Sequence, residues 1–256
     1  MKNLAVQLFG HLRTFRRTFD SFRACVIEPH ERGGYAVDVF LHTWDELEFN
    51  GGTYHNQNGV IAGTKVSDGD IGFIRKNYKP RELAIERLGA AHGLNLSIAG
   101  VNRLRREYEQ KTGSEYEWVI STRPDLLFKT PFLVDDYVKE YDGPLSQNIK
   151  LTDDALFVAN NIFGRMNVSD PRYVAECDLL MFGKGDASLL MLNNKIPESF
   201  SDVRQIPIKY HLWKDFELCR AQSERPEARK PVRFRLLRQL AACFIPSKEL
   251  RRKIRE

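Results

Sequence analysis

The sequence has few cysteines and no long hydrophobic run. Four cysteines are scattered along the 256 residues and form no CxxC pair: Cys25, Cys177, Cys219 and Cys243. This spacing argues against a cysteine-ligated metal module and is typical of reduced thiols in a cytosolic protein. No stretch approaches the roughly 18–20 apolar residues of a membrane span, and the apolar run near the N-terminus lacks a small-residue cleavage site. We therefore expect a cytoplasmic protein with neither a transmembrane helix nor a signal peptide.

The sequence also lacks the common glycine-rich motifs that bind phosphate. The first predicted turn after a strand, Gly10–Thr14, contains one glycine, so it is neither a GxGxxG nor a GxxxxGK[ST] motif. Gly10 would still let the backbone approach a ligand closely, and Arg13 could bind a phosphate through two hydrogen bonds. The alternative is an arginine at the start of a helix that faces water.

Positive charge is concentrated at one end of the chain. Residues 229–256 carry ten Lys or Arg against two Glu, a net charge of +8, whereas the whole chain carries +5. The other 228 residues therefore sum to −3, and the pI near 9.0 describes the tail and not the body. We expect a body of residues 1–228 and a basic tail of residues 229–256. A nucleic-acid-binding protein that acts through this tail is an alternative, but the acidic body argues against nucleic acid as a partner.

The hydrophobic pattern predicts strands that alternate with helices. Hydrophobic residues make up 42% of the chain, which is enough for a core. Apolar runs predict strands over 4–9, 35–41, 118–120, 155–159 and 179–182, and the pattern predicts helices over 15–28, 80–112 (interrupted near Gly93) and 186–194. The polar, glycine-rich segment 44–79 is predicted to be a long functional loop. We therefore predict an α/β fold with a mostly parallel sheet flanked by helices.

The strand predicted over 118–120 ends in a polar turn. Because Pro124 cannot continue a central strand, Arg123 and Asp125 follow the C-terminal end of the strand, where open α/β sheets bind ligands. A guanidinium and a carboxylate there can bind an anionic, metal-bound substrate such as a sugar nucleotide. The alternative is a structural Arg–Asp pair that stiffens the strand exit.

The strand predicted over 35–41 is also followed by polar or aromatic side chains. Trp44 could stack on a base or a sugar ring, and His42 could donate to a phosphate or a hydroxyl. For these two residues alone we favour the alternative, a core tryptophan beside a satisfied histidine. However, Gly10–Arg13 and Arg123–Asp125 also follow predicted strands. Three predicted strands therefore end in polar clusters, and we expect all three ends to lie at one edge of one sheet.

Further candidate residues lie later in the chain. Asp153 and Asp154 precede the strand predicted over 155–159. Paired acids in a cleft suit metal binding or general-base catalysis, because one carboxylate raises the pKa of the other. His211 could ligate a metal. The alternatives are a solvated turn for the two acids and simple packing for the histidine.

These segments resemble GT-A-like glycosyltransferases of bacterial lipopolysaccharide and capsule synthesis. The similar segments are Leu8–Phe15, Val37–Asp45, Arg123–Leu126 and, in the tail, Phe244–Arg255. The resemblance covers residues 3 to about 215 and the tail, through short motifs. It implies a Rossmann-like sheet and an enzyme that moves a sugar from a nucleotide-diphosphate donor to a glycan or lipid-linked acceptor.

The resemblance also implies roles for single residues. In this family Mn²⁺ or Mg²⁺ joins a DxD motif to the donor diphosphate, whereas the matching strand end here reads Arg123-Pro124-Asp125. Metal dependence therefore stays open: Arg123 could neutralise the diphosphate itself, while Asp125 holds a single metal or a ribose hydroxyl. Asp154, beside Asp153, would be the base that deprotonates the acceptor. The donor-binding residues would be Gly10, Arg13, His42, Trp44, Arg123 and Asp125. A catalytically inactive scaffold with this fold is an alternative.

The tail has the pattern of an amphipathic helix. Its apolar stripe, which recurs every four residues among basic ones, consists of Val232, Leu236, Leu240 and Phe244. Basic amphipathic segments lie at the surface of anionic membranes. We predict a helical tail that docks the protein at the inner face of the membrane, near a lipid-linked acceptor. Packing of the stripe on the body is the alternative.

Overall fold

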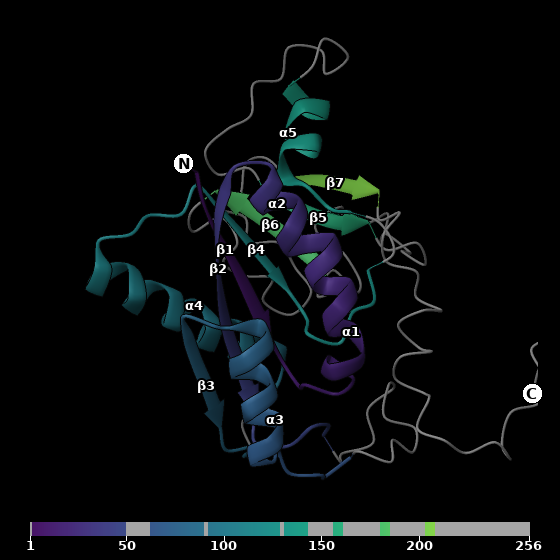
Figure 1. The fold of residues 1–256 in the computed structure, drawn as a ribbon, viewed down its shortest axis with the longest axis vertical. Helices are drawn as coiled ribbons and strands as arrows, with labels where there is room; N and C mark the ends of the chain where they lie inside the picture. Colours follow the sequence, from purple (N-terminus) through teal and green to yellow (C-terminus); the bar gives the residue numbers. More distant parts are fainter. Residues whose placement is uncertain are drawn as a thin grey trace, which may run out of the picture. The chain divides into compact units, whose positions relative to one another are not determined.

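The computed structural model describes residues 2–49, 62–89, 92–128, 131–142, 156–160, 180–184 and 203–207. These residues form a seven-stranded sheet with helices on both faces (Figure 1). The strands are β1 (Lys2–Phe9), β2 (Tyr35–Trp44), β3 (Glu82–Glu86), β4 (Trp118–Thr122), β5 (Leu156–Asn160), β6 (Leu180–Lys184) and β7 (Val203–Pro207). The helices are α1 (Phe15–Phe22), a π-helical segment (Arg23–Ile27), α2 (Glu28–Arg32), α3 (Asp68–Phe73), a second π-helical segment (Ile74–Tyr78), α4 (Leu94–Thr112) and α5 (Val134–Asp142).

The sheet is mostly parallel. Its strand order is β3-β2-β1-β4-β6-β5-β7. The pairs β1–β2, β1–β4, β2–β3 and β5–β7 are parallel, whereas β6 runs antiparallel to both of its neighbours, β4 and β5. The predicted α/β fold with a mostly parallel sheet flanked by helices is therefore confirmed.

Alternation along β1 sends its side chains into two hydrophobic cores, one on each face of the sheet. The core between the sheet and α1 contains Leu4, Val6, Leu8, Phe15, Phe19 and Phe22. The core between the sheet and α4 contains Ala5, Phe9, Phe40, Ile98 and Val101. Each large apolar side chain buried in this way contributes roughly 1.5–3 kcal/mol, so both helices hold the central strands firmly.

Two predictions about the middle of the chain are wrong in part, although the helix over 94–112 is confirmed. The helix predicted over 80–112 is β3 followed by α4, because Glu82–Glu86 pairs in parallel with the end of β2. The predicted interruption near Gly93 is the start of α4. The loop predicted over 44–79 includes helical residues 68–78, which begin where Ser67 and Asp70 form a reciprocal capping box.

The later part of the chain is described less fully. The strands predicted over 118–120, 155–159 and 179–182 correspond to β4, β5 and β6, whereas β7 was not predicted. The helix predicted over 186–194, the tail and the domain boundary at residue 228 lie outside the described residues. Within the described ranges, no helix is long and apolar enough to cross a membrane.

Candidate functional site

The strand order reverses between β1 and β4. From β1 the chain continues to β2 and β3 on one side of the sheet, while β4 lies on the other side (Figure 1). In open α/β sheets such a reversal leaves a crevice at the carboxyl ends of the two strands, where ligands bind. β1 leads to Gly10 and Arg13, and β4 leads to Arg123 and Asp125. This edge is therefore the candidate site.

The turn after β1 has an unusual backbone. Gly10 has a φ of 92° and Arg13 a φ of 46°, and the left-handed region is uncommon for a residue with a side chain. The Arg13 N–H donates to the Leu47 carbonyl at 3.0 Å, and the fully buried Leu12 anchors the turn in the core. Strain of this kind costs on the order of 1–3 kcal/mol and clusters at functional sites.

Four charged side chains meet at this edge and form what we call the edge network. Arg123 donates to both oxygens of Asp125, at 2.9 and 2.8 Å. Arg13 donates from Nη1 to Asp125 at 3.1 Å and from Nε to Glu48 at 2.5 Å. Asp125 is 0% exposed, Glu48 4% and Arg123 8%. The network is thus shielded from water, and its two positive and two negative formal charges cancel.

The exit of β4 is also held from the α1 side. Thr18 Oγ1 donates to the carbonyl of Pro124 at 2.6 Å. Together with the fork between Arg123 and Asp125, this bond fixes the polar turn that follows the strand. The structural Arg–Asp pair, considered from the sequence as an alternative, is therefore present, and Arg13 joins it from the neighbouring strand exit.

Sequence reasoning missed two residues at this edge, Glu48 and His11. His11 is 8% exposed, and its Nδ1 lies 2.9 Å from the carbonyl of Glu46, so Nδ1 is the donor and Nε2 an acceptor. Burial lowers the pKa of His11 more than the bond to Glu46 raises it, and the nearby Arg13 lowers it further. The imidazole is therefore neutral at pH 7. Glu48 and His11 could not be found from the sequence, because each is a single polar residue in an irregular segment without a periodic hydrophobic pattern.

His42 and Trp44 lie in the core and not at the ligand edge. β2 extends to Trp44, so its alternation directs both side chains to the face that α4 covers. Trp44 is 4% exposed, and its Nε1 donates to Ser97 Oγ at 3.0 Å. His42 is fully buried beneath Gly100, where an added Cβ would lie 2.3 Å from the imidazole ring. The core position that we favoured for both residues fits this arrangement, but the histidine is not satisfied as expected: neither ring nitrogen of His42 makes a hydrogen bond with a described residue, and Nε2 lies 3.4 Å from a Glu86 carboxylate oxygen.

Asp125, the predicted metal ligand among the described residues, is bonded to arginine at the carboxyl edge. Each oxygen of the fully buried Asp125 accepts from an arginine. In the part of the chain that the structure describes, no group of three or more His, Cys, Asp or Glu side chains could hold a metal. Asp153, Asp154 and His211 lie outside that part. The metal role of Asp125 and His211 and the catalytic role of the two acids stay predictions.

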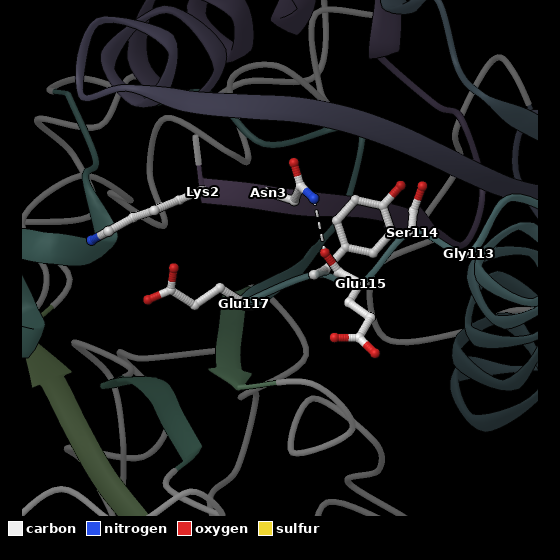
Figure 2. Close-up of a pocket in the computed structure, with 7 residues that line it drawn as sticks. Lys2, Asn3, Gly113, Ser114, Glu115 and Glu117 are labelled. Atoms are coloured by element: carbon white, nitrogen blue, oxygen red, sulfur yellow. Dashed lines mark hydrogen bonds between the residues drawn. The ribbon is translucent and has the colours of Figure 1, made fainter.

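A cavity of about 630 Å³ lies at the opposite, amino edge of β1 and β4 (Figure 2). Lys2 and Asn3 at the start of β1 line it together with residues 113–117, which lead into β4. Asn3 Nδ2 donates to the Glu115 carbonyl at 3.0 Å and joins the two sides. No residue predicted for the site lines this cavity, so it is separate from the edge network.

Neither a protein-family model nor a curated protein sequence matches the chain. The fold alone does not select an activity, because α/β sheets of this kind carry many unrelated functions. The function is therefore argued from the three strand exits and from the side chains that they bring together.

Proposed function

We propose that the protein is a GT-A-like glycosyltransferase of bacterial surface polysaccharide synthesis. It would move a sugar from a nucleotide-diphosphate donor to a glycan or lipid-linked acceptor. One observation carries the proposal: the segments Leu8–Phe15, Val37–Asp45 and Arg123–Leu126, which resemble this family, include or follow the ends of adjacent, parallel strands. Segments far apart in the sequence thus meet at the edge where α/β sheets bind ligands.

Arg13 and Arg123 are the proposed binding residues for the donor diphosphate. Fixed donors stabilise the negative charge that develops on a leaving group, and a guanidinium suits phosphate because it donates two parallel hydrogen bonds. The Arg13 side chain is 14% exposed and that of Arg123 9%, so Arg13 is the more accessible. His11 offers Nε2 as an acceptor for a donor hydroxyl, and Asp154 is proposed as the base.

Arg13→Ala is expected to weaken binding of a nucleotide-diphosphate sugar roughly 10- to 150-fold, because a hydrogen bond to a charged group contributes about 1.5–3 kcal/mol. Calorimetric titration of the wild type and the variant with several donors measures the change. Arg16→Ala is the control, since Arg16 lies nearby in the first turn of α1 but pairs with Asp70 at 2.8 Å and is 44% exposed. If Arg13→Ala bound every donor as tightly as the wild type, the site assignment would be rejected.

The alternative of a catalytically inactive scaffold has one observation in its favour. Arg123 and Asp125 bond to each other where the family carries two acids. The two proposals differ in turnover. Slow hydrolysis of a bound donor, with or without added Mn²⁺, supports the enzyme, whereas donor binding without hydrolysis or transfer to any acceptor supports the scaffold.

The basic tail is proposed to dock the enzyme at the inner face of the membrane. The basic amphipathic pattern of residues 229–256 supports this proposal, and these residues lie outside the described ranges. Each cation near an anionic surface contributes about 1 kcal/mol. In co-sedimentation the full chain should bind anionic but not neutral vesicles, and binding should weaken as salt rises. Equal vesicle binding after removal of residues 229–256 would show that the tail is not the anchor.

A further inference from the structure

Arg13 lies between two carboxylates, and both sides of its guanidinium are engaged. Nε donates to Glu48 and Nη1 to Asp125. The two acceptors are almost fully buried, with 5% and 0% of their side chains exposed, whereas the Arg13 side chain is the most accessible member of the edge network at 14%. An anion that approaches Arg13 therefore competes with a carboxylate that is already bound.

The two carboxylates are carried by different parts of the fold. Asp125 follows a central strand, and after loss of Arg13 it would keep the fork with Arg123. Glu48 belongs to the short segment 45–48, which pairs with residues 62–66 outside the main sheet through isolated bridges. The N–H of Gly63 donates to the Glu48 carbonyl at 3.0 Å. Glu48 is therefore the carboxylate that can withdraw with the least disturbance of the sheet.

The charges of the edge network also favour withdrawal of Glu48. The formal charges of the four side chains of the edge network cancel, and a diphosphate on Arg13 would bring its negative charge against the Glu48 and Asp125 carboxylates that bond to the same guanidinium. Like charges that are brought together in a shielded site cost several kcal/mol. Tight binding of a diphosphate on Arg13 is thus incompatible with a Glu48 carboxylate that stays bonded to the same guanidinium.

We propose that Glu48 is an internal competitor for Arg13 and that the donor diphosphate binds in exchange for the Glu48 carboxylate. The identity of the anion rests on the proposed glycosyltransferase function, whereas the exchange rests on the geometry of the edge network. Glu48 then sets specificity. A weakly bound monoanion does not displace it, and a ligand with two phosphate groups and further contacts does.

Titration of the full chain with inorganic pyrophosphate tests the exchange. Glu48→Gln removes the competing charge, and we expect this variant to bind pyrophosphate at least about tenfold more tightly than the wild type. Glu46→Gln is the matched control, because it removes the same charge from the same segment while Glu46 pairs with Lys65 at 2.9 Å on the exposed side. The control should stay within about twofold of the wild type.

If the role of Glu48 were purely structural, Glu48→Gln would not bind pyrophosphate more tightly than the wild type. Loss of a structural partner would loosen Arg13 and leave pyrophosphate affinity unchanged or lower, and that result would overturn the proposal, as would an absence of binding by both proteins. Should Glu48→Gln fail to fold, Glu48→Asp withdraws the carboxylate by one methylene and keeps its charge. This variant should also bind pyrophosphate more tightly than the wild type, and equal or weaker binding overturns the exchange.

The same proteins, titrated with nucleotide-diphosphate sugars, separate the two proposals. If the wild type hydrolyses a donor but Glu48→Gln gains no affinity for pyrophosphate, the exchange is wrong and the glycosyltransferase proposal stands. If no donor is bound or hydrolysed while Glu48→Gln still binds pyrophosphate more tightly, the exchange stands and the glycosyltransferase proposal is wrong.

Discussion

Asp125→Ala is expected to lower the free energy of unfolding by about 3–5 kcal/mol, because it removes one partner from a buried set of ion pairs. Asp125 is fully buried and accepts from Arg123 through both oxygens and from Arg13 through one. Without this carboxylate two guanidinium groups lose their shared partner at an edge that is shielded from water. Since domains are stable by only about 5–15 kcal/mol, the loss is a large fraction of the total.

Urea unfolding followed by circular dichroism measures the effect. Asp68→Ala is the control, because Asp68 is an exposed acid in the first turn of α3, and its loss should cost less than about 1 kcal/mol. The double variant Asp125→Ala/Arg123→Ala should be less destabilised than the sum of the single variants, since it also removes one of the stranded charges. A loss below about 1 kcal/mol for Asp125→Ala would contradict the buried network.

Five of the seven described strands could be predicted from the sequence, and the two outermost strands of the sheet, β3 and β7, could not. Trp118–Ile120 is an apolar run closed by a proline turn, so local pattern suffices for β4. Glu82–Glu86 consists of Glu, Leu, Ala and Ile, and most of these residues favour helices. It forms β3 because it pairs with β2. Whether such a segment forms a strand depends on the strands that lie beside it in the folded protein, and the sequence does not show which strands these are.

The location of the candidate site was predictable, whereas the roles of its residues were not. Parallel strands end at one edge, so the exits of β1, β2 and β4 had to meet. The hydrophobic pattern did not fix the end of β2. With an end at Leu41, His42 could have faced a ligand, but β2 continues to Trp44 and His42 faces α4. Glu48 escaped notice because its bond to Arg13 depends on the path of segment 45–48.

Stability is expected to fall steeply as the pH drops below about 6.5. Burial lowers the pKa of three histidines from 6.5, and these are His11, His30 and His42. His30 shows the reason most clearly. Its Nδ1 lies 2.6 Å from the Val26 carbonyl, and its Nε2 accepts from the Val134 N–H at 3.1 Å. A second proton on the ring would point at another donor, so the folded protein holds this imidazole neutral.

The sign of the effect follows from proton linkage. When the folded pKa is the lower one, the unfolded chain binds the proton first as the pH falls. The stability contributed by each histidine is therefore complete above pH 6.5 and is lost between that pH and the folded pKa. Each group gives a slope of at most about 1.4 kcal/mol per pH unit, so three give at most about 4 kcal/mol per pH unit. Asp70, whose pKa the Ser67 and Arg16 bonds lower despite burial, adds its loss only below about pH 4.

Urea unfolding at about pH 7.5, 6.5 and 5.5 measures this slope. His30→Gln should make the slope shallower, by at most about 1.4 kcal/mol per pH unit, because one of the three linked protons is gone. His92→Gln, at a partly exposed position, is the control for the substitution itself. Stability that stayed flat from pH 7.5 to 5.5 would mean that these imidazoles take up protons without unfolding. The bond from the Val134 N–H to Nε2, which joins the start of α5 to α2, would then be wrong, because a protonated Nε2 needs an acceptor, whereas Nδ1 would keep donating to the Val26 carbonyl.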